Sequence, residues 1–264
     1  MRPSRLPGLL RFLRGLARLI SARPHVPRPL QGNVALRTIL ERRSQRRFQE
    51  RDLDPDAWRA ILEAGRVAPS TVNLQTWSFA WFTRASWQET FGRRLPFGAP
   101  RAVIVLADTH RARRVVTGFP EVPLCDHTVG VMNASLAAMN MAQAAEALGI
   151  GAVMLSETGK TGFYDAAELA AALQLPPRVI PLMTVVFGHP DAAPPPMPPR
   201  LPLDAVAFPG RYRETPRPVL EGWFEQMQAG YRASAGQAFD RQVDHYNRRL
   251  ADAETDLRRL VLGD

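Results

Sequence analysis

Two short segments of this 264-residue chain carry side chains that suit a cofactor. Residues 42–48 read RRSQRRF, and residues 68–77 read APSTVNLQTW. The first segment offers guanidinium groups and a hydroxyl, which suit a phosphate because the planar donor fork of arginine matches two phosphate oxygens. The second offers small and amide side chains on a turn, which suit a polar heterocycle. Together the two segments predict a phosphorylated cofactor that carries a ring.

The order and spacing of these segments resemble the FMN-dependent nitroreductase family, in its NADPH-dependent nitroreductase and flavin-reductase subgroup. That family opens with R-S-x-R-x-F and then A-P-S-x-x-N-x-Q-x-W. The match continues with Asp126, with AAEALGIG at residues 144–151 and with GHP at residues 188–190. It ends at PRLP, residues 199–202, which resembles the K-P-R-x-P phosphate clamp of the subgroup. The resemblance covers about residues 34 to 235.

The resemblance implies FMN as a noncovalent cofactor, with NADPH or NADH as the electron donor. Arg42, Arg43 and Ser44 would hold the phosphate and ribityl chain, and Arg200 would add another arginine from far along the chain. Arg46 would lie near the pyrimidine edge of the ring, where a fixed positive charge stabilises developing negative charge.

The ring would be bound by the second segment and by the residues that follow a later strand. Pro69 and Ser70 would supply backbone contacts, and Gln75 would bond the pyrimidine edge or the ribityl hydroxyls. The backbone amides of residues 156–158 would face the ring nitrogen that accepts hydride. The full predicted cofactor-binding set is Arg42, Arg43, Ser44, Arg46, Pro69, Ser70, Asn73, Gln75, Ser156, Glu157, Thr158 and Arg200.

The sequence departs from the family pattern at two places. Pro198 stands where the clamp lysine is expected, and Ser156 and Glu157 stand where a pair of glycines is expected. The second departure keeps the backbone amides but adds bulk and a carboxylate beside the ring, so it bears on substrate preference more than on FMN binding. Lys160, the only lysine, could form an ion pair with Glu157, bind a cofactor phosphate or lie exposed on the surface, and the surface position is favoured.

No side chain is predicted to be catalytic, because a flavin carries the redox chemistry itself. The sequence shows no serine-elbow motif, no glycine-rich phosphate loop and no carboxylate pair placed for hydrolysis. Cys125 is the only cysteine and the five histidines are scattered, so no metal site is predicted.

The positive charge of the chain is concentrated in its N-terminal tail. Of the formal net charge of +9, residues 1–30 carry +7 from seven arginines and no acidic residue, which leaves +2 for residues 31–264. Nucleic-acid binding requires a basic stripe on the folded body, so no nucleic-acid partner is predicted.

Residues 9–20 have a helical pattern with arginines on one face. The segment is too short to span a bilayer, and its arginines interrupt any signal-peptide core. It could contact an anionic membrane surface weakly or belong to an organellar presequence, but a helix that docks on the body or stays disordered is the favoured interpretation. The predicted location is cytoplasmic, with a membrane-peripheral one as the alternative.

The elements of the chain interleave strands and helices, which predicts one domain of class α+β or α/β with decorated ends. Helices are expected around Leu36 to Leu40, from Asp54–Pro55 onward, and at 127–148 and 165–174, with strands at 77–83, 101–107, 151–155 and 180–187. Trp77, Phe79 and Trp81 alternate at strand spacing, which predicts sheet core rather than a stacking platform. The resemblance implies a nitroreductase-like fold: a mostly antiparallel central sheet flanked by helices, in an intertwined homodimer.

Three regions follow from these patterns. Residues 1–33 form the basic tail and a proline-rich linker, residues 34–235 form the FMN-binding domain, and residues 236–264 form a C-terminal helix. That helix has a seam of apolar residues in steps of four and three, from Phe239 and Val243 to Leu257 and Leu260. It is predicted to clasp the partner subunit, although packing on its own subunit is the alternative.

The predicted activity is hydride transfer from NAD(P)H to a nitroaromatic, quinone or flavin acceptor by a ping-pong mechanism. Two alternatives remain: a flavin-holding protein with little turnover, or a specialised relative on the same fold, such as a dehalogenase, a flavin-degrading or an azoline-oxidising enzyme. The expected partners are a second copy of the chain and a small-molecule acceptor. The sequence identifies neither the physiological acceptor nor a preference between NADH and NADPH.

Overall fold

The computed structural model describes residues 9–10, 12–13, 15–17, 24, 26–156, 160–235 and 239–263. Their contacts divide the chain into two compact units. The body unit contains residues 27–195 and 249–264, and the second unit contains residues 1–26 and 196–248. None of the described helices has the length and apolar character that crossing a membrane requires.

The body unit is built on a four-stranded sheet in which every neighbouring pair is antiparallel. In spatial order the strands are β1 (Trp77–Thr83), β2 (Arg101–Asp108), β4 (Val179–Gly188) and β3 (Gly151–Leu155). The two central strands are almost continuously buried and apolar because helices cover both faces of the sheet. All four predicted strands are present, and the α+β class with an antiparallel sheet is confirmed.

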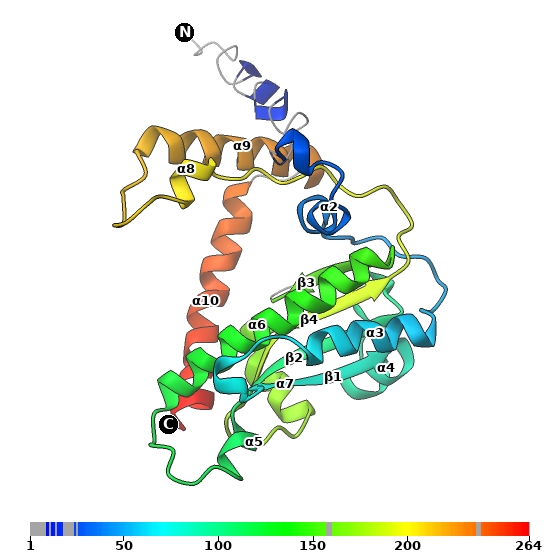
Figure 1. Ribbon diagram of the computed structural model, residues 1–264, viewed down its shortest axis with the longest axis vertical. Coiled ribbons are helices and arrows are strands. Elements are labelled where there is room, and N and C mark those ends of the chain that lie inside the picture. Colours follow the sequence, from blue (N-terminus) through cyan, green and yellow to red (C-terminus); the bar gives the residue numbers. More distant parts are fainter. Residues whose placement is uncertain are drawn as a thin grey trace. The chain divides into compact units, whose positions relative to one another are not determined.

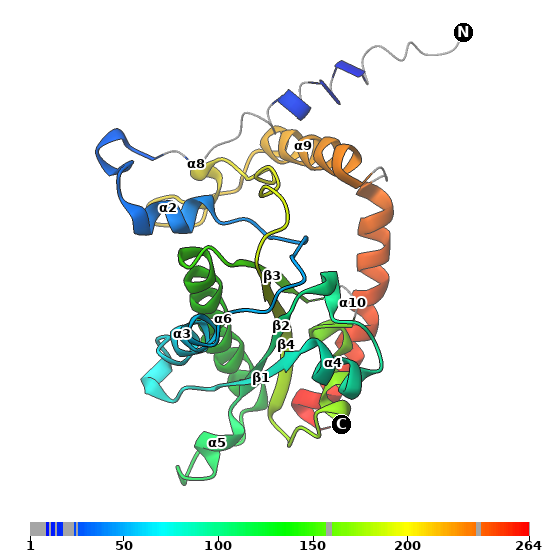
Figure 2. The same cartoon turned by 90° about the vertical axis from the view of Figure 1, so that its right-hand side faces the viewer.

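Helices cover both faces of this sheet (Figures 1 and 2). Helices α3 (Pro55–Arg66) and α6 (Pro123–Ala147) cover one face, and α4 (Arg84–Phe91) and α7 (Ala166–Ala172) cover the other. The first pair approaches closely: a Cβ atom on Gly65 would lie 2.8 Å from the Cγ of Met141. Glycine at this position therefore allows α3 to pack directly on α6.

The predicted start of α3 is confirmed by its capping bonds. Asp54 accepts hydrogen bonds from the backbone amides of Asp56, at 2.9 Å, and Ala57, at 3.1 Å. Pro55 occupies the first helical position, where a missing amide hydrogen costs nothing. Helix α2 (Val34–Glu41) is capped in the same way by Asn33.

The structure corrects the sequence prediction on the second face of the sheet. Helix α4 was not predicted; it follows β1 without a loop because Thr83 and Ser86 form a reciprocal capping box. Its Trp87 is fully buried in the second core cluster. The predicted core triplet is also wrong in one member: Trp77 is buried and Phe79 half-buried, but Trp81 is 51% exposed on the edge strand.

Helix α6 has apolar residues on more than one side, but only one side is buried among the described residues. Its small residues pack on the sheet and on α3, with Ala134, Ala137 and Ala138 fully buried. The opposite side leaves Met132, Leu136 and Met139 between 40% and 57% exposed. The prediction that this helix is buried therefore holds for one face, and the other face is an apolar stripe open to a partner.

The remaining helices are α5 (His110–Arg113), α8 (Leu203–Val206), α9 (Arg217–Ala235) and α10 (Phe239–Leu262). In the second unit Phe239 packs edge to face against Phe224 and Tyr231 of α9. The described tail residues 9–10, 12–13 and 15–17 are helical, and a Cβ atom on Gly15 would lie 2.8 Å from the Cβ of Ala229. This contact fits the favoured interpretation of a docked helix.

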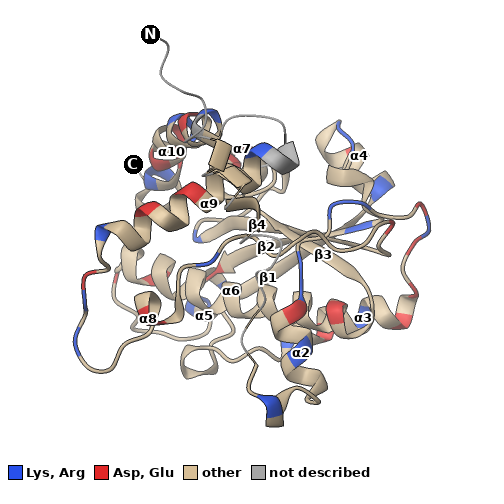
Figure 3. Ribbon diagram, turned by 90° about the horizontal axis from the view of Figure 1, so that it is seen from above, with Lys and Arg blue, Asp and Glu red and all other residues tan. Residues whose placement is uncertain are grey.

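The last turns of α10 belong to the body unit. Ala253 is buried, and Leu257, Leu260 and Val261 pack against the first core cluster. Acidic and basic residues both occur along α10 (Figure 3). This part of the seam thus packs on its own chain, and the role of residues 236–264 as a dimer clasp stays a prediction.

Candidate functional site

The predicted phosphate-binding segment runs from the end of α2 along the edge strand β3. Ser44 forms a parallel bridge with Ala152, and the amide of Gln45 donates to the carbonyl of Ala152 at 3.0 Å. The Gln45 side chain turns inward, is buried, and donates to the carbonyl of Ala192 at 2.9 Å. Because side chains alternate along an extended segment, Ser44 and Arg46 point the other way.

Arg43 closes the end of α2. Its Nη1 donates to the carbonyls of Leu40, at 3.0 Å, and Arg42, at 2.9 Å. Cations suit this position because the last carbonyls of a helix have no partner within the helix. Arg43 therefore stabilises the turn that presents Arg42 and Ser44, besides its predicted role toward a phosphate.

Glu146, in the last turn of α6, faces this arginine pair. Burial raises the pKa of its carboxyl, while the charges of Arg42 and Arg43 act to lower it and that of Glu41 to raise it. Burial is the largest of these effects, so the ionised form of the carboxyl is disfavoured although two guanidinium groups act to stabilise it. Glu146 was not predicted to belong to the site, because only the packing of α2 on α6 brings its carboxyl near the two arginines.

We expect Glu146→Gln to tighten FMN binding, because it removes a negative charge from the pocket predicted for the phosphate. The expected gain is roughly 1 kcal/mol, a factor of about five in Kd. The folded-state pKa of Glu146 is raised, so its favourable contribution to stability is present at acid pH and is lost as the pH rises through that pKa. The negative charge of Glu146 develops over the same pH interval, so the gain in FMN affinity of Glu146→Gln should grow as the pH rises.

Flavin fluorescence titrations of the wild type and the variant, repeated across the pH range, measure this effect. Glu89→Gln, an exposed charge removal on α4, is the control. An equal or weaker affinity of Glu146→Gln at neutral pH would contradict the assignment.

The predicted ring-binding turn, residues 69–76, is held by a side chain from α6. Asn133, which is 2% exposed, accepts from the amide of Thr71 at 3.2 Å and donates to the hydroxyl of Thr76 at 2.8 Å. Ser70 accepts from the amide of Gln75 at 3.0 Å, which closes the turn. Sequence analysis missed Asn133, and no local signal marks it.

The backbone of this turn is strained. Val72, Asn73 and Gln75 have φ angles of 51°, 55° and 49°, in the left-handed region that residues other than glycine rarely adopt. Each such residue costs on the order of 1–3 kcal/mol and persists only where its surroundings fix it, commonly at binding sites. The exposed side chains of Asn73 and Gln75 are thus presented outward by a turn that Asn133 fixes.

The arginine segment and the strained turn lie near different points along the length of α6. Glu146 marks the first and Asn133 the second. These residues are 13 positions apart in one helix, or roughly 20 Å at 1.5 Å per residue. Within one chain the two halves of the predicted site are therefore well separated.

The region after β3 is described in part. Ser156 is exposed, and the predicted contacts Glu157 and Thr158 lie outside the described residues. A Cβ atom on Gly162 would lie 2.5 Å from the Cα of Ser156, so only glycine fits behind it. Lys160 pairs with Glu168 at 2.5 Å, a partner that sequence analysis did not name.

Arg200 belongs to the second unit, where it is exposed and follows a buried Pro199. Pro198 and the other prolines of residues 194–199 leave this stretch without regular secondary structure. The participation of Arg200 in the phosphate clamp stays a prediction from the resemblance.

An open cleft of about 670 Å³ adjoins the strained turn. Its lining residues are Arg66, Leu74, Gln75, Trp77, Ser78, Phe79, Arg111, Ala112 and Val115. Asp108, which is 5% exposed, holds Arg111 at 3.0 Å and also accepts from the hydroxyl of Ser78. The cleft thus combines apolar and polar side chains with a guanidinium group that is paired with Asp108; neither Asp108 nor Arg111 was predicted from the sequence.

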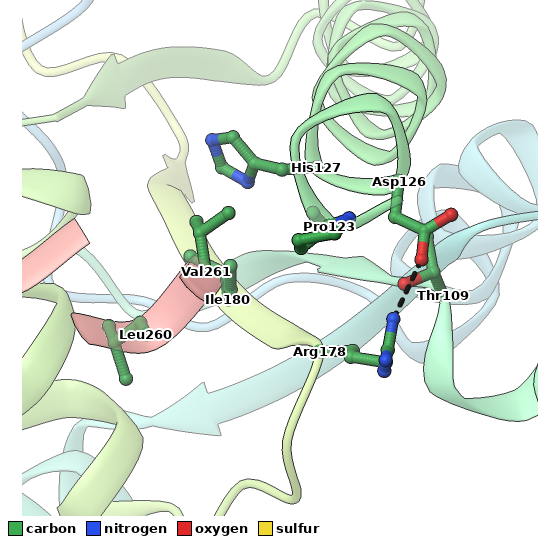
Figure 4. Close-up of a pocket in the computed structure, with 9 residues that line it drawn as sticks. Thr109, Pro123, Asp126, His127, Arg178, Ile180, Leu260 and Val261 are labelled. Carbon is green, nitrogen blue, oxygen red and sulfur yellow. Dashed lines mark hydrogen bonds and ion pairs between the residues drawn. The ribbon is translucent and has the colours of Figure 1, made fainter. Parts of the chain in front are cut away.

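A second, smaller cavity lies at the start of α6, beside a group of ion pairs that joins several elements (Figure 4). Its volume of about 20 Å³ admits no more than a water molecule. Asp126 accepts from Arg113 and Arg178, both at 2.8 Å, and this ion-pair group joins α5, α6 and the turn before β4. Among the described residues no cluster of His, Cys, Asp or Glu could hold a metal ion.

Comparisons with known proteins agree with this architecture. A model of the nitroreductase family matches residues 39–95, which include both predicted segments. A putative NADH dehydrogenase/NAD(P)H nitroreductase of Archaeoglobus fulgidus is 30% identical over 165 residues, which are 59% of this chain and 84% of that protein. The chain belongs to the nitroreductase family.

Other members of the nitroreductase family match over more of the chain. An FMN reductase [NAD(P)H] of Bacillus subtilis is 28% identical over 240 residues, 84% of this chain and 87% of that protein. The solved structure of an NADPH:FMN oxidoreductase from Vibrio harveyi complexed with NAD⁺ superposes with a TM-score of 0.65 at 25% identity. It covers 84% of this chain and 98% of its own. The nitroreductase-like fold inferred from the sequence is confirmed.

Proposed function

We propose that this nitroreductase is an FMN-dependent oxidoreductase that takes electrons from NADPH or NADH and reduces a small nitroaromatic, quinone or flavin acceptor. The observation that carries the proposal is the turn of residues 69–76. Three residues hold left-handed backbone conformations there, a buried Asn133 fixes the turn, and an open cleft adjoins it. A strained turn of this kind beside a cleft suits a ring-shaped ligand.

The residues present fit FMN at both ends. Arg42 and Arg43 follow each other at one end, where both charges act on Glu146, and an anionic phosphate would pair with them. Ser44 and Arg46 project from the same edge, and Arg200 would complete the clamp. At the other end Pro69, Ser70, Asn73 and Gln75 would contact the ring, with the amides that follow Ser156 facing its reactive nitrogen.

Bound FMN supplies the two-electron redox chemistry. The residues of this chain bind and orient the reactants and stabilise charge. Arg46 would place a positive charge beside the pyrimidine edge, where negative charge increases during reduction. Gln75 lines both the predicted ring site and the cleft, so an acceptor in the cleft would lie against the ring. The Phe79 side chain and the Arg111 guanidinium would orient it.

The site is completed by a second copy of the chain in this proposal. The arginine segment and the strained turn lie roughly 20 Å apart along α6, so each half needs its complement from elsewhere. The exposed stripe of Met132, Leu136 and Met139 lies on the same helix. A homodimer that packs α6 against its copy would cover the stripe and bring together halves from different chains.

The test is an anaerobic titration followed by steady-state kinetics. The purified protein is expected to be yellow, to bleach with NADPH or NADH under nitrogen, and to regain its colour with a quinone. Because one cleft serves donor and acceptor in turn, initial rates at varied NAD(P)H and quinone should give parallel double-reciprocal lines.

Each alternative predicts a different result. A colourless protein that binds no added FMN would contradict the proposal as a whole. A yellow protein that does not bleach would be a flavin holder, and intersecting lines would mean that donor and acceptor bind together in separate places.

A further inference from the structure

Helix α10 contacts Tyr164 and Asp165, which follow in sequence the segment predicted to face the flavin nitrogen. The guanidinium of Arg249 donates to Oδ1 of Asp165 at 2.8 Å and to the carbonyl of Tyr164 at 3.3 Å. It also lies over the Tyr164 ring, 6.0 Å from its centroid. One side chain from near the C-terminus thus makes three contacts with two consecutive residues.

Those two residues are joined tightly to the end of β3. Three residues before Asp165, Gly162 lies so close to Ser156 that a Cβ atom would be 2.5 Å from the Ser156 Cα. The carbonyl of Thr161 accepts from the hydroxyl of Thr184 on β4 at 2.6 Å, and both residues are fully buried. A shift of Tyr164 or Asp165 would therefore be transmitted to Ser156, because closely packed backbone deforms little.

Arg249 stabilises the charged form of Asp165. Burial raises the pKa of its carboxyl, and the hydrogen bond and charge of Arg249 act in the opposite direction. Glu168 and Lys160 also face this carboxyl, with smaller raising and lowering effects. Its Oδ2 is buried without a hydrogen-bond partner among the described residues. Removing Arg249 would leave a half-buried carboxylate without its hydrogen-bonded cation, which is costly.

The part of α10 that carries Arg249 is packed against the body unit. One turn beyond Arg249, Ala253 is 1% exposed, and Leu257 and Leu260 pack against the first core cluster. Arg249 is 25% exposed at its side chain, whereas Arg258 on the same helix is 67% exposed and pairs only locally with Glu254. The two arginines therefore offer a matched comparison on one helix.

We propose that Arg249 is a positioning residue: through Tyr164 and Asp165 it fixes the backbone behind Ser156 and so orients the Ser156 amide, one of those predicted to face the flavin ring. This inference rests on the proposed function. It gives α10 a part in the chemistry of its own chain, in addition to any part in dimer formation.

The experiment compares Arg249→Ala and Arg249→Lys with the control Arg258→Ala, all in the full-length chain. The first readout needs no cofactor: amide hydrogen exchange of the flavin-free protein should rise in residues 150–165 of Arg249→Ala and stay unchanged in Arg258→Ala. The second readout is the flavin itself. Arg249→Ala should keep stoichiometric FMN, since the phosphate contacts are elsewhere, but show altered flavin fluorescence and visible absorbance.

Reduction by NADPH should be slower in Arg249→Ala by roughly tenfold to hundredfold, the usual effect of a small misplacement at a reacting centre. Arg249→Lys should restore much of the rate because it keeps a positive charge near Asp165. The defect should shrink as the pH falls and protonates the unpaired Asp165, and the double variant Arg249→Ala/Asp165→Asn should lack this pH dependence.

Three results would overturn the proposal: unchanged exchange and flavin spectra in Arg249→Ala, equal defects in Arg258→Ala, or no rescue by lysine. If Arg249→Ala fails to fold, the single variant Asp165→Ala, which removes the side-chain acceptor for Arg249, replaces it and should show the same spectral change. A wild-type protein that binds no FMN would contradict the proposed function, while the exchange measurement would still test the link from Arg249 to Ser156.

Discussion

A chain that carries both Arg43→Ala and Arg200→Ala is expected to lose its yellow colour on gel filtration. Each charge-assisted hydrogen bond to a phosphate contributes roughly 1.5 to 3 kcal/mol, so the loss of both arginines should weaken FMN binding on the order of a thousandfold. The measurement is the ratio of flavin to protein absorbance after filtration, with a fluorescence titration for the remaining affinity.

The control for this variant removes the same charge from exposed arginines. Arg47→Ala combined with Arg217→Ala should keep full flavin content, because Arg47 is exposed and Arg217 pairs only with Glu221 on the surface. Since Arg43 also closes α2, the thermal midpoint of the flavin-free protein should be measured alongside. Stoichiometric FMN in Arg43→Ala/Arg200→Ala would show that the assigned clamp is wrong.

Leu136→Glu is expected to give a monomer without flavin. Leu136 lies at the centre of the exposed stripe on α6, between Met132 and Met139, where we propose that two chains meet. An unpaired carboxylate buried in an apolar interface costs several kcal/mol, and two-fold symmetry introduces it twice. Light scattering would report the mass, and flavin absorbance would report whether the site survives.

The matched control is Gln88→Glu, which adds the same charge to α4 on the opposite face of the sheet (Figure 2). It should remain dimeric and yellow. A dimer of Leu136→Glu with full flavin content would contradict the α6 interface. A wild-type protein that is a flavin-bound monomer at micromolar concentration would contradict the shared site as well.

The sequence by itself determined the local features of this protein. Asp54 and Pro55 marked the start of α3, the apolar runs placed all four strands, and the two spaced segments led to the family. These features are readable because each depends on residues close together in the chain, such as a cap and its amides or a strand and its alternation. Even locally one signal was missed, the capping box of Thr83 and Ser86.

Only the tertiary structure decided which distant residues support the candidate site. Asn133 reaches across 62 positions to hold the turn at Thr71, and Gln45 turns inward to a carbonyl 147 positions away. Glu146 meets the arginine pair, and Arg249 meets Asp165, only because helices pack beside them. Such contacts depend on which helix faces which, and that is decided by burial summed over the whole core rather than by any local pattern.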